Sequence, residues 1–123
     1  MKSTLTLPQG NAICYSGYRE GQSPDRQPYP SVEQIRDDLH LLARHWQLIR
    51  LYDCSVHAER VLQVIHEDRL PLRVMLGAYL AAEASNPGCP WGGLHSETQL
   101  EANRCENQAE LERLVELARR HAD

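Results

Sequence analysis

Three apolar runs along the chain are each followed by a segment with helical hydrophobic spacing. The runs are Ala12–Tyr18, Leu48–Cys54 and Leu72–Leu80, and the helical segments begin near Ser31, Ser55 and Ser96. Strands that alternate with helices predict a parallel sheet, because parallel strands need a long crossover between them. Three such strands cannot close into a barrel, so the alternation predicts a part of a larger α/β architecture.

The pattern divides the 123 residues into five segments of one incomplete domain. They are a lead-in at 1–11, the first βα unit and second strand at 12–54, the second helix and third strand at 55–80, a Pro/Gly-rich loop at 81–95 and a long third helix at 96–123. Ser31 and Gln34 have the spacing of a capping box at a helix start. Ser96 and Gln99 repeat this spacing at the last helix.

The composition is that of an ordinary globular protein, with 41% hydrophobic and 24% charged residues. The net charge of −4 argues against nucleic acid or an anionic membrane as a partner, because both attract clustered Lys and Arg. The most apolar stretch, Val74–Ala82, is about half the roughly 20 residues that span a bilayer. No long apolar segment precedes Pro8, so we expect no secretory signal and a cytoplasmic location.

The spacing of the cysteines, histidines and glycines predicts neither a metal site nor a cofactor. The four cysteines are widely spaced and form no CxxC pair: Cys14, Cys54, Cys89 and Cys105. Without a signal peptide such thiols are in most cases reduced, so we expect neither a zinc site nor a disulfide. His40 and His45 do not share a helix face, which is typical of surface histidines. Gly17 and Gly21 lack the Lys-Ser/Thr ending of a phosphate-binding loop.

Arg50 provides a local argument for a barrel. Because side chains alternate along a strand, Arg50 and Tyr52 share one face, and the neighbouring residues Ile49 and Leu51 share the other. Helices cover both faces of an open doubly wound sheet, whereas the inner face of a barrel can hold a guanidinium in a polar network. We therefore expect Arg50 in a barrel interior, with a carboxylate partner on a strand outside this chain. The alternative is a sheet edge, where Arg50 reaches solvent.

The aromatic residues suit the binding of a sugar ring. The chain has no Phe, five Tyr and two Trp, and Tyr and Trp combine a flat apolar face with a hydrogen-bonding edge. Tyr15, Tyr18 and Tyr52 lie in or just after strands, where parallel sheets place their binding sites. Tyr15 and Tyr79 can equally be packed core residues. Trp91 lies in the Pro/Gly-rich loop and is a candidate binding platform.

Asp53 and Glu83 lie at the ends of the second and third predicted strands and could form a carboxylate pair. Glycosidases use such pairs, and the separation of the two carboxyl groups decides the stereochemical outcome. Asp53 directly precedes a helix start, so its alternative role is to bond to that helix's backbone or to complement its dipole. One interpretation of this pair is a small α/β enzyme that uses both carboxylates, although no nucleophile, base or metal-ligand set surrounds them.

Three short motifs follow one another in order: Cys14-Tyr15-Ser16-Gly17-Tyr18, Ile49-Arg50-Leu51-Tyr52-Asp53 and Val74-Met75-Leu76-Gly77-Ala78. Together they resemble the first three strands of glycoside hydrolase family 17. The loop Asn86–Gly93 and the segment Glu101–Arg104 also resemble its bacterial members, which are described as similar to exo-β-1,3-glucanases. The resemblance runs from about Ala12 to the C-terminus.

This resemblance implies a partial (β/α)8 TIM barrel, comprising about the first three βα units of a retaining enzyme that acts on β-1,3-glucan. It implies that Tyr52 lines the sugar subsite nearest the cleavage point, with Tyr15 and Tyr18 beside it. Asp53 and Trp91 complete the expected substrate-binding set, for a β-glucan or oligosaccharide. The family's two catalytic Glu residues belong to later strands, so no residue here receives a catalytic role and we expect this chain alone to be inactive.

A second interpretation belongs to a different class of protein. The chain is then a non-catalytic α/β binding or assembly module, such as a truncated gene product, whose unpaired strand edges support self-association. This interpretation predicts a cooperative thermal transition and a defined dimer or larger species.

Overall fold

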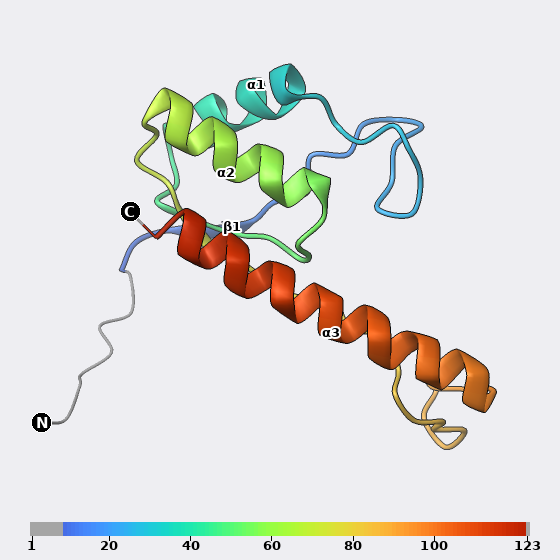
Figure 1. Ribbon diagram of the computed structural model, residues 1–123. Helices are drawn as coiled ribbons and strands as arrows, with labels where there is room; N and C mark the ends of the chain where they lie inside the picture. The colour runs from blue at the N-terminus through green and yellow to red at the C-terminus, as the bar shows by residue number, and fades with distance from the viewer. Residues whose placement is uncertain (1–8, 123) are drawn as a thin grey trace, which may run out of the picture. The chain divides into compact units, whose positions relative to one another are not determined.

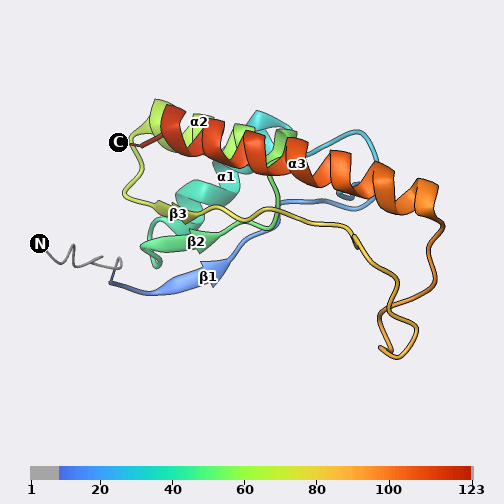
Figure 2. The ribbon, with the colours of Figure 1, turned by 60° about the horizontal axis from the view of Figure 1, so that its bottom comes forward.

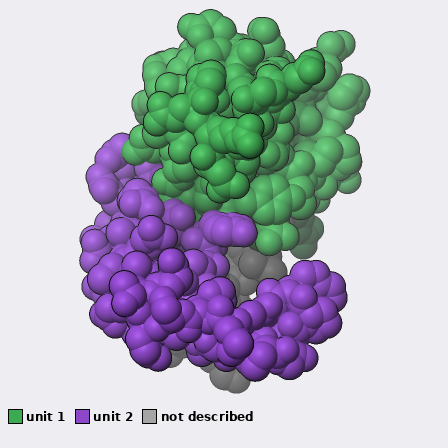
Figure 3. Space-filling view, turned by 90° about the vertical axis from the view of Figure 1, so that its right-hand side faces the viewer, with its two compact units in different colours: residues 1–77 green, residues 78–123 purple. Residues whose placement is uncertain are grey.

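In the computed structural model, which describes residues 9–122, three strands alternate with three helices (Figure 1). The strands are β1 (Ala12–Cys14), β2 (Leu48–Arg50) and β3 (Arg73–Met75), and the helices are α1 (Val32–Leu42), α2 (Val56–Asp68) and α3 (Glu97–Arg120). The chain divides into two compact units, 1–77 and 78–123 (Figure 3). Residues 1–8 of the expected lead-in and Asp123 of the last segment lie outside the described residues.

The three strands form a parallel sheet in the order β1-β2-β3, as the alternation predicted (Figure 2). Its middle row joins Ile13, Ile49 and Val74, and these side chains pack in or against the hydrophobic core. The strands are shorter than the apolar runs, and the core continues beyond the strand ends. Tyr15 and Leu51 follow their strands directly and are still buried in the core.

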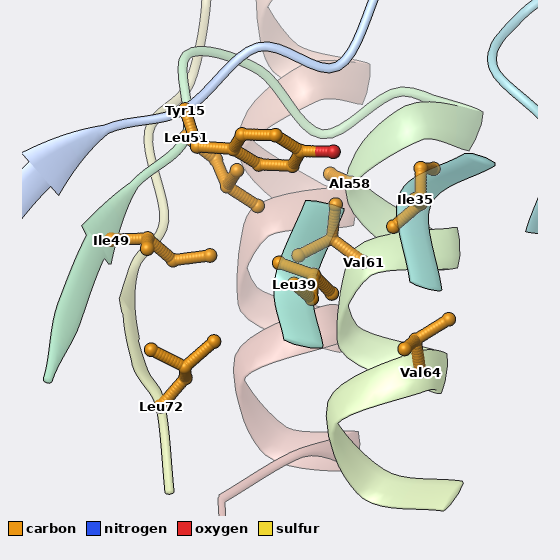
Figure 4. Close-up of a cluster of buried hydrophobic side chains, with 9 residues drawn as sticks. All are labelled: Tyr15, Ile35, Leu39, Ile49, Leu51, Ala58, Val61, Val64 and Leu72. Carbon is orange, nitrogen blue, oxygen red and sulfur yellow. The ribbon is translucent and has the colours of Figure 1, made fainter. Parts of the chain in front are cut away.

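The core of the first unit lies between the sheet and the two helices α1 and α2, which cover one face of the sheet (Figure 4). Its buried residues are Tyr15, Ile35, Leu39, Ile49, Leu51, Ala58, Val61, Val64 and Leu72. In both helices the core residues recur every three or four positions, which is the spacing of one helical stripe. No helix among residues 9–122 is both long and apolar enough to cross a membrane.

The helix starts confirm the predicted caps at Ser31 and Ser96. The Ser31 hydroxyl accepts from the Gln34 amide at 3.1 Å, and the Gln34 side chain accepts from the Ser31 amide at 3.0 Å, completing the capping box. The Ser96 hydroxyl accepts from the backbone amide of Gln99 at 3.1 Å, which is one of the two bonds of the predicted box, while the Gln99 side chain donates to Asn103 at 2.8 Å. At α2 the N-cap Ser55 makes no side-chain bond to the helix and is bonded to Asp53 instead.

In the second unit, two asparagines fix an extended segment to α3. Asn107 forms a two-point amide pair with Ala81, accepting from its N–H at 2.8 Å and donating to its C=O at 2.9 Å. Asn103 donates to the carbonyl of Ala82 at 2.8 Å. Both asparagines are buried, because their amides satisfy backbone groups that an apolar side chain would leave unpaired.

We expect Asn107→Ala to speed hydrogen exchange at the Ala81 amide by at least roughly tenfold, since that amide loses its acceptor. Site-resolved exchange by NMR measures the effect. Asn103→Ala is the matched control, because it removes one bond to Ala82 and leaves both bonds to Ala81 in place. Equal exchange at Ala81 in the two variants would contradict this assignment.

Candidate functional site

The carboxyl ends of β1 and β2 bring an aromatic and polar cluster together in the first unit. The Tyr18 ring stacks on the His57 ring, with centroids 4.9 Å apart and planes at 16°. His57 lies in the first turn of α2, and its Nε2 accepts a hydrogen bond from the Gly17 amide at 3.0 Å. The negative charge of Asp53 acts on both rings. Two predicted site residues, Tyr18 and Asp53, therefore lie in one cluster.

His57 is the member of this cluster that sequence reasoning missed. It is 4% exposed, and its burial lowers its pKa, against the opposing charges of Asp53 and Asp38. The histidines considered from the sequence, His40 and His45, are exposed, as predicted. The position of His57 in the sequence could have indicated a site residue, because it is the second residue after the N-cap of a helix that follows a strand end.

The Tyr18 hydroxyl is buried and has no hydrogen-bond partner among the described residues. Burial raises the pKa of Tyr18, and the negative charge of Asp53 raises it further. The Ser55 hydroxyl is near enough to lower that pKa slightly, but its own hydrogen bond goes to Asp53 at 2.7 Å. A buried donor without an acceptor is uncommon in proteins.

Asp53 has the structural role that the sequence left as its alternative. Its Oδ1 accepts from both the backbone amide of Ser55, at 3.2 Å, and the Ser55 hydroxyl. Both bonds hold the residue against the start of α2, and both use the same carboxylate oxygen. Glu83, the other carboxylate considered, is exposed and belongs to the second unit.

Tyr15 lies in the hydrophobic core, as Figure 4 shows, which was the alternative to a sugar-binding role. Its side chain is 8% exposed, and its hydroxyl donates to Asp38 Oδ2 at 2.7 Å. Burial, followed by this hydrogen bond to a carboxylate, raises the pKa of Tyr15 far above its usual range. Tyr15 therefore supports the cluster from its core side, and its ring has no exposed face that a ligand could contact.

The loop between Tyr15 and Arg19 is anchored on both sides. Arg19 forms a bidentate pair with Asp38, with two N–O distances of 2.8 Å, and its guanidinium also donates to the Gly17 carbonyl at 2.8 Å. A Cβ at Gly17 would clash with the Tyr15 hydroxyl and press on His57 Nε2. The backbone passes between these two side chains, which only glycine allows.

Arg50 and Tyr52 lie on the sheet side away from the core. Cys14, Arg50 and Met75 form one row across the three strands, and all three are exposed. The Arg50 guanidinium lies 5.3 Å from the centroid of the Tyr52 ring, within the range of a cation–π contact. Arg50 is on the central strand, so the sheet-edge alternative does not describe its position, although it does reach solvent. The Tyr52 ring is 46% exposed.

Trp91 is presented by a short closed loop in the second unit and is 92% exposed. The stem of the loop is closed by a hydrogen bond from the Asn86 amide to the Gly93 carbonyl at 3.0 Å. Ser85 and His95 are bonded across the same stem, with the His95 amide donating to the Ser85 hydroxyl at 2.9 Å. The loop therefore displays an indole on a defined scaffold.

The described residues contain no group of three His, Cys, Asp or Glu side chains arranged to hold a metal ion. The four cysteines form no disulfide.

Comparison with protein-family models finds no match, and comparison with curated proteins finds none. A solved structure is similar: an endo-laminarinase from Formosa Hel1_33_131, with a TM-score of 0.64 and 28% sequence identity. The likeness covers 92% of this chain but 28% of the endo-laminarinase chain, so the 123 residues match less than a third of its length. It supports a relation between this chain and the glycoside hydrolases.

Proposed function

We propose that the chain is the N-terminal portion of a retaining glycoside hydrolase of family 17 that acts on β-1,3-glucan. The likeness to the endo-laminarinase, at 28% identity over 92% of this chain, carries the proposal. The fold supports it, because helices α1 and α2 cover one sheet face while the other presents Arg50, Met75 and Cys14 to solvent. Under this proposal that face lines the interior of a (β/α)8 barrel whose other strands lie beyond the sheet described here.

Sugar binding is proposed at the carboxyl ends of β1 and β2. Tyr52 offers a partly exposed ring to the apolar face of a pyranose, with Arg50 against the ring. Asp53 bonds to the helix start through Oδ1, and under this proposal its Oδ2 accepts from a sugar hydroxyl. Tyr18 is proposed to line the site with its partly exposed side chain, while its hydroxyl is buried, and Tyr15 supports this end of the sheet from the core.

Trp91 contributes a separate platform in the second unit, where its exposed indole can stack on a sugar ring. Neither catalytic carboxylate of a retaining glycosidase is assigned to this chain. Both the acid/base and the nucleophile of such an enzyme must flank the scissile bond at about 5–5.5 Å from each other. We therefore expect the purified chain to bind oligosaccharide without cleaving it.

Titration of the chain with laminarin oligosaccharides, followed by NMR, tests the proposal. We expect saturable binding, and Tyr52→Ala should weaken it by at least roughly tenfold because an aromatic platform is lost. Tyr79→Ala is the matched control, since Tyr79 is a tyrosine exposed to 74% that has no proposed role. Oligosaccharides with β-1,4 linkages serve as the control ligand and should bind more weakly.

Two results would contradict the proposal. Release of reducing ends from laminarin by the pure chain would show that it carries its own catalytic groups. No binding, together with a defined dimer in sedimentation, would instead favour the non-catalytic assembly module, whose unpaired strands are the sheet edges β1 and β3.

A further inference from the structure

Sugar binding alone does not explain the burial of His57 or its hydrogen bond to Gly17. The side chain is almost completely buried, and its Nε2 accepts from the Gly17 amide at 3.0 Å, across 40 residues of sequence. An imidazole nitrogen that accepts a hydrogen bond carries no proton, so the ring proton is on Nδ1 and the ring is neutral. This hydrogen bond therefore exists in one protonation state only.

The surroundings of His57 favour that neutral state. Burial lowers its pKa, and a place in the first turn of α2 adds the positive end of the helix dipole. Two carboxylates oppose this effect, Asp53 from the β2–α2 connection and Asp38 from α1. The other titratable groups against the ring are the phenols of Tyr18 and Tyr15, which are neutral well below their ordinary pKa of about 10, and burial raises the pKa of both.

The Tyr18 ring stacks on the same His57 ring. The two rings are stacked at 4.9 Å, and the Tyr15 ring meets His57 at 5.6 Å with a tilt of 36°. His57 thus fixes both the backbone of Gly17 and the ring of Tyr18. The other anchor of this loop is the Arg19–Asp38 pair, which is further along the loop.

We propose that His57 is a positioning residue that holds Gly17 and Tyr18 in their sugar-binding geometry while its ring is neutral, and that its protonation releases them. This inference rests on the proposed function. Protonated Nε2 becomes a donor that faces another donor, the Gly17 N–H. The cation is then drawn to the Asp53 and Asp38 carboxylates, and the loop loses one anchor.

The direction of the pH dependence follows from the sign of the shift. An unfolded His57 takes up its proton near its ordinary pKa of about 6.5, whereas the folded ring resists protonation. Below about pH 6.5 the unfolded state therefore binds more protons, and the stability from this group is lost as the pH falls through the folded pKa. Oligosaccharide affinity should fall over the same lower range.

The test follows the full chain by NMR from about pH 7.5 to about pH 4.5, with and without laminarin oligosaccharide. We expect the Gly17 amide shift to titrate together with the His57 ring, and the affinity to drop roughly tenfold across that titration. In His57→Gln the amide oxygen can still accept from Gly17 but cannot titrate, so the drop should disappear. His57→Phe keeps a stacked ring without an acceptor and should bind weakly throughout. His45→Gln, at an exposed histidine, is the control and should behave as the original chain.

The outcomes separate this inference from the proposed function. If no oligosaccharide binds at any pH while Gly17 still follows His57, the sugar site is wrong and the positioning of the loop stands. If Gly17 does not follow His57, if the ring stays neutral across the whole range, or if His57→Gln keeps the original pH dependence of binding, the inference is overturned.

Discussion

Replacing Leu39 with alanine is expected to lower the free energy of unfolding of the first unit by about 2–5 kcal/mol. Leu39 belongs to α1, has no exposed surface and packs in the core between its own helix, α2 and the sheet. The loss combines the transfer of the removed atoms with the cavity that they leave. Since small domains have about 5–15 kcal/mol in total, this single change removes a large fraction of the stability.

Leu41→Ala is the matched control for this prediction, because it deletes the same atoms two positions along the same helix. Leu41 is 58% exposed, so its truncation should change the free energy of unfolding by about 0.5 kcal/mol or less. Urea denaturation followed by circular dichroism measures both variants. Similar midpoints for Leu39→Ala and Leu41→Ala would mean that α1 does not pack on the core as described.

Asp38→Ala is expected to have the second largest effect, a loss of about 1–4 kcal/mol in the free energy of unfolding. Most of it comes from the Tyr15 hydroxyl, which is left buried without an acceptor at a cost of about 1–3 kcal/mol. The lost pair with Arg19 adds about 1 kcal/mol at most, because that side chain is 38% exposed and can turn to water. Asp37→Ala removes the same charge at an exposed position and is the control.

A double-mutant cycle separates the two contributions of Asp38. Tyr15→Phe removes the hydroxyl that Asp38 would leave stranded, so adding it to Asp38→Ala should restore part of the lost stability. In the original chain the same Tyr15→Phe change should destabilise, since it breaks a good hydrogen bond. A destabilisation of equal size in both backgrounds would show that the two groups are not coupled.

The parts of the fold that depend on local sequence were predictable. The capping box at Ser31 needs only Gln34 three residues later, and the parallel order of the strands follows from their alternation with helices. The ends of the strands were less predictable, because apolar residues continue after the ladder stops. The strand alternation also predicts which side chains face the core. It places Tyr15 with Ile13 on the core side, and the structure has both there.

The site was predictable only in part because its contacts join distant segments. Tyr18 and Asp53 could be found because they lie at the ends of apolar runs, but the partner of Gly17 is His57, 40 residues away. A single sequence gives no measure of such a distance. The roles of Asn103 and Asn107 were hidden for the same reason, since they look like interruptions of a helix stripe and in fact bond to residues 81 and 82.

Alternation along the strands gives two of the three rows across the sheet different roles. One row, Ile13, Ile49 and Val74, holds the sheet to its helices, while the row of Cys14, Arg50 and Met75 does not contribute to the core. The outward row is therefore able to change in size and charge without disturbing the packing underneath it. Residues on one side of the sheet can therefore vary in evolution while the packed scaffold on the other side stays constant.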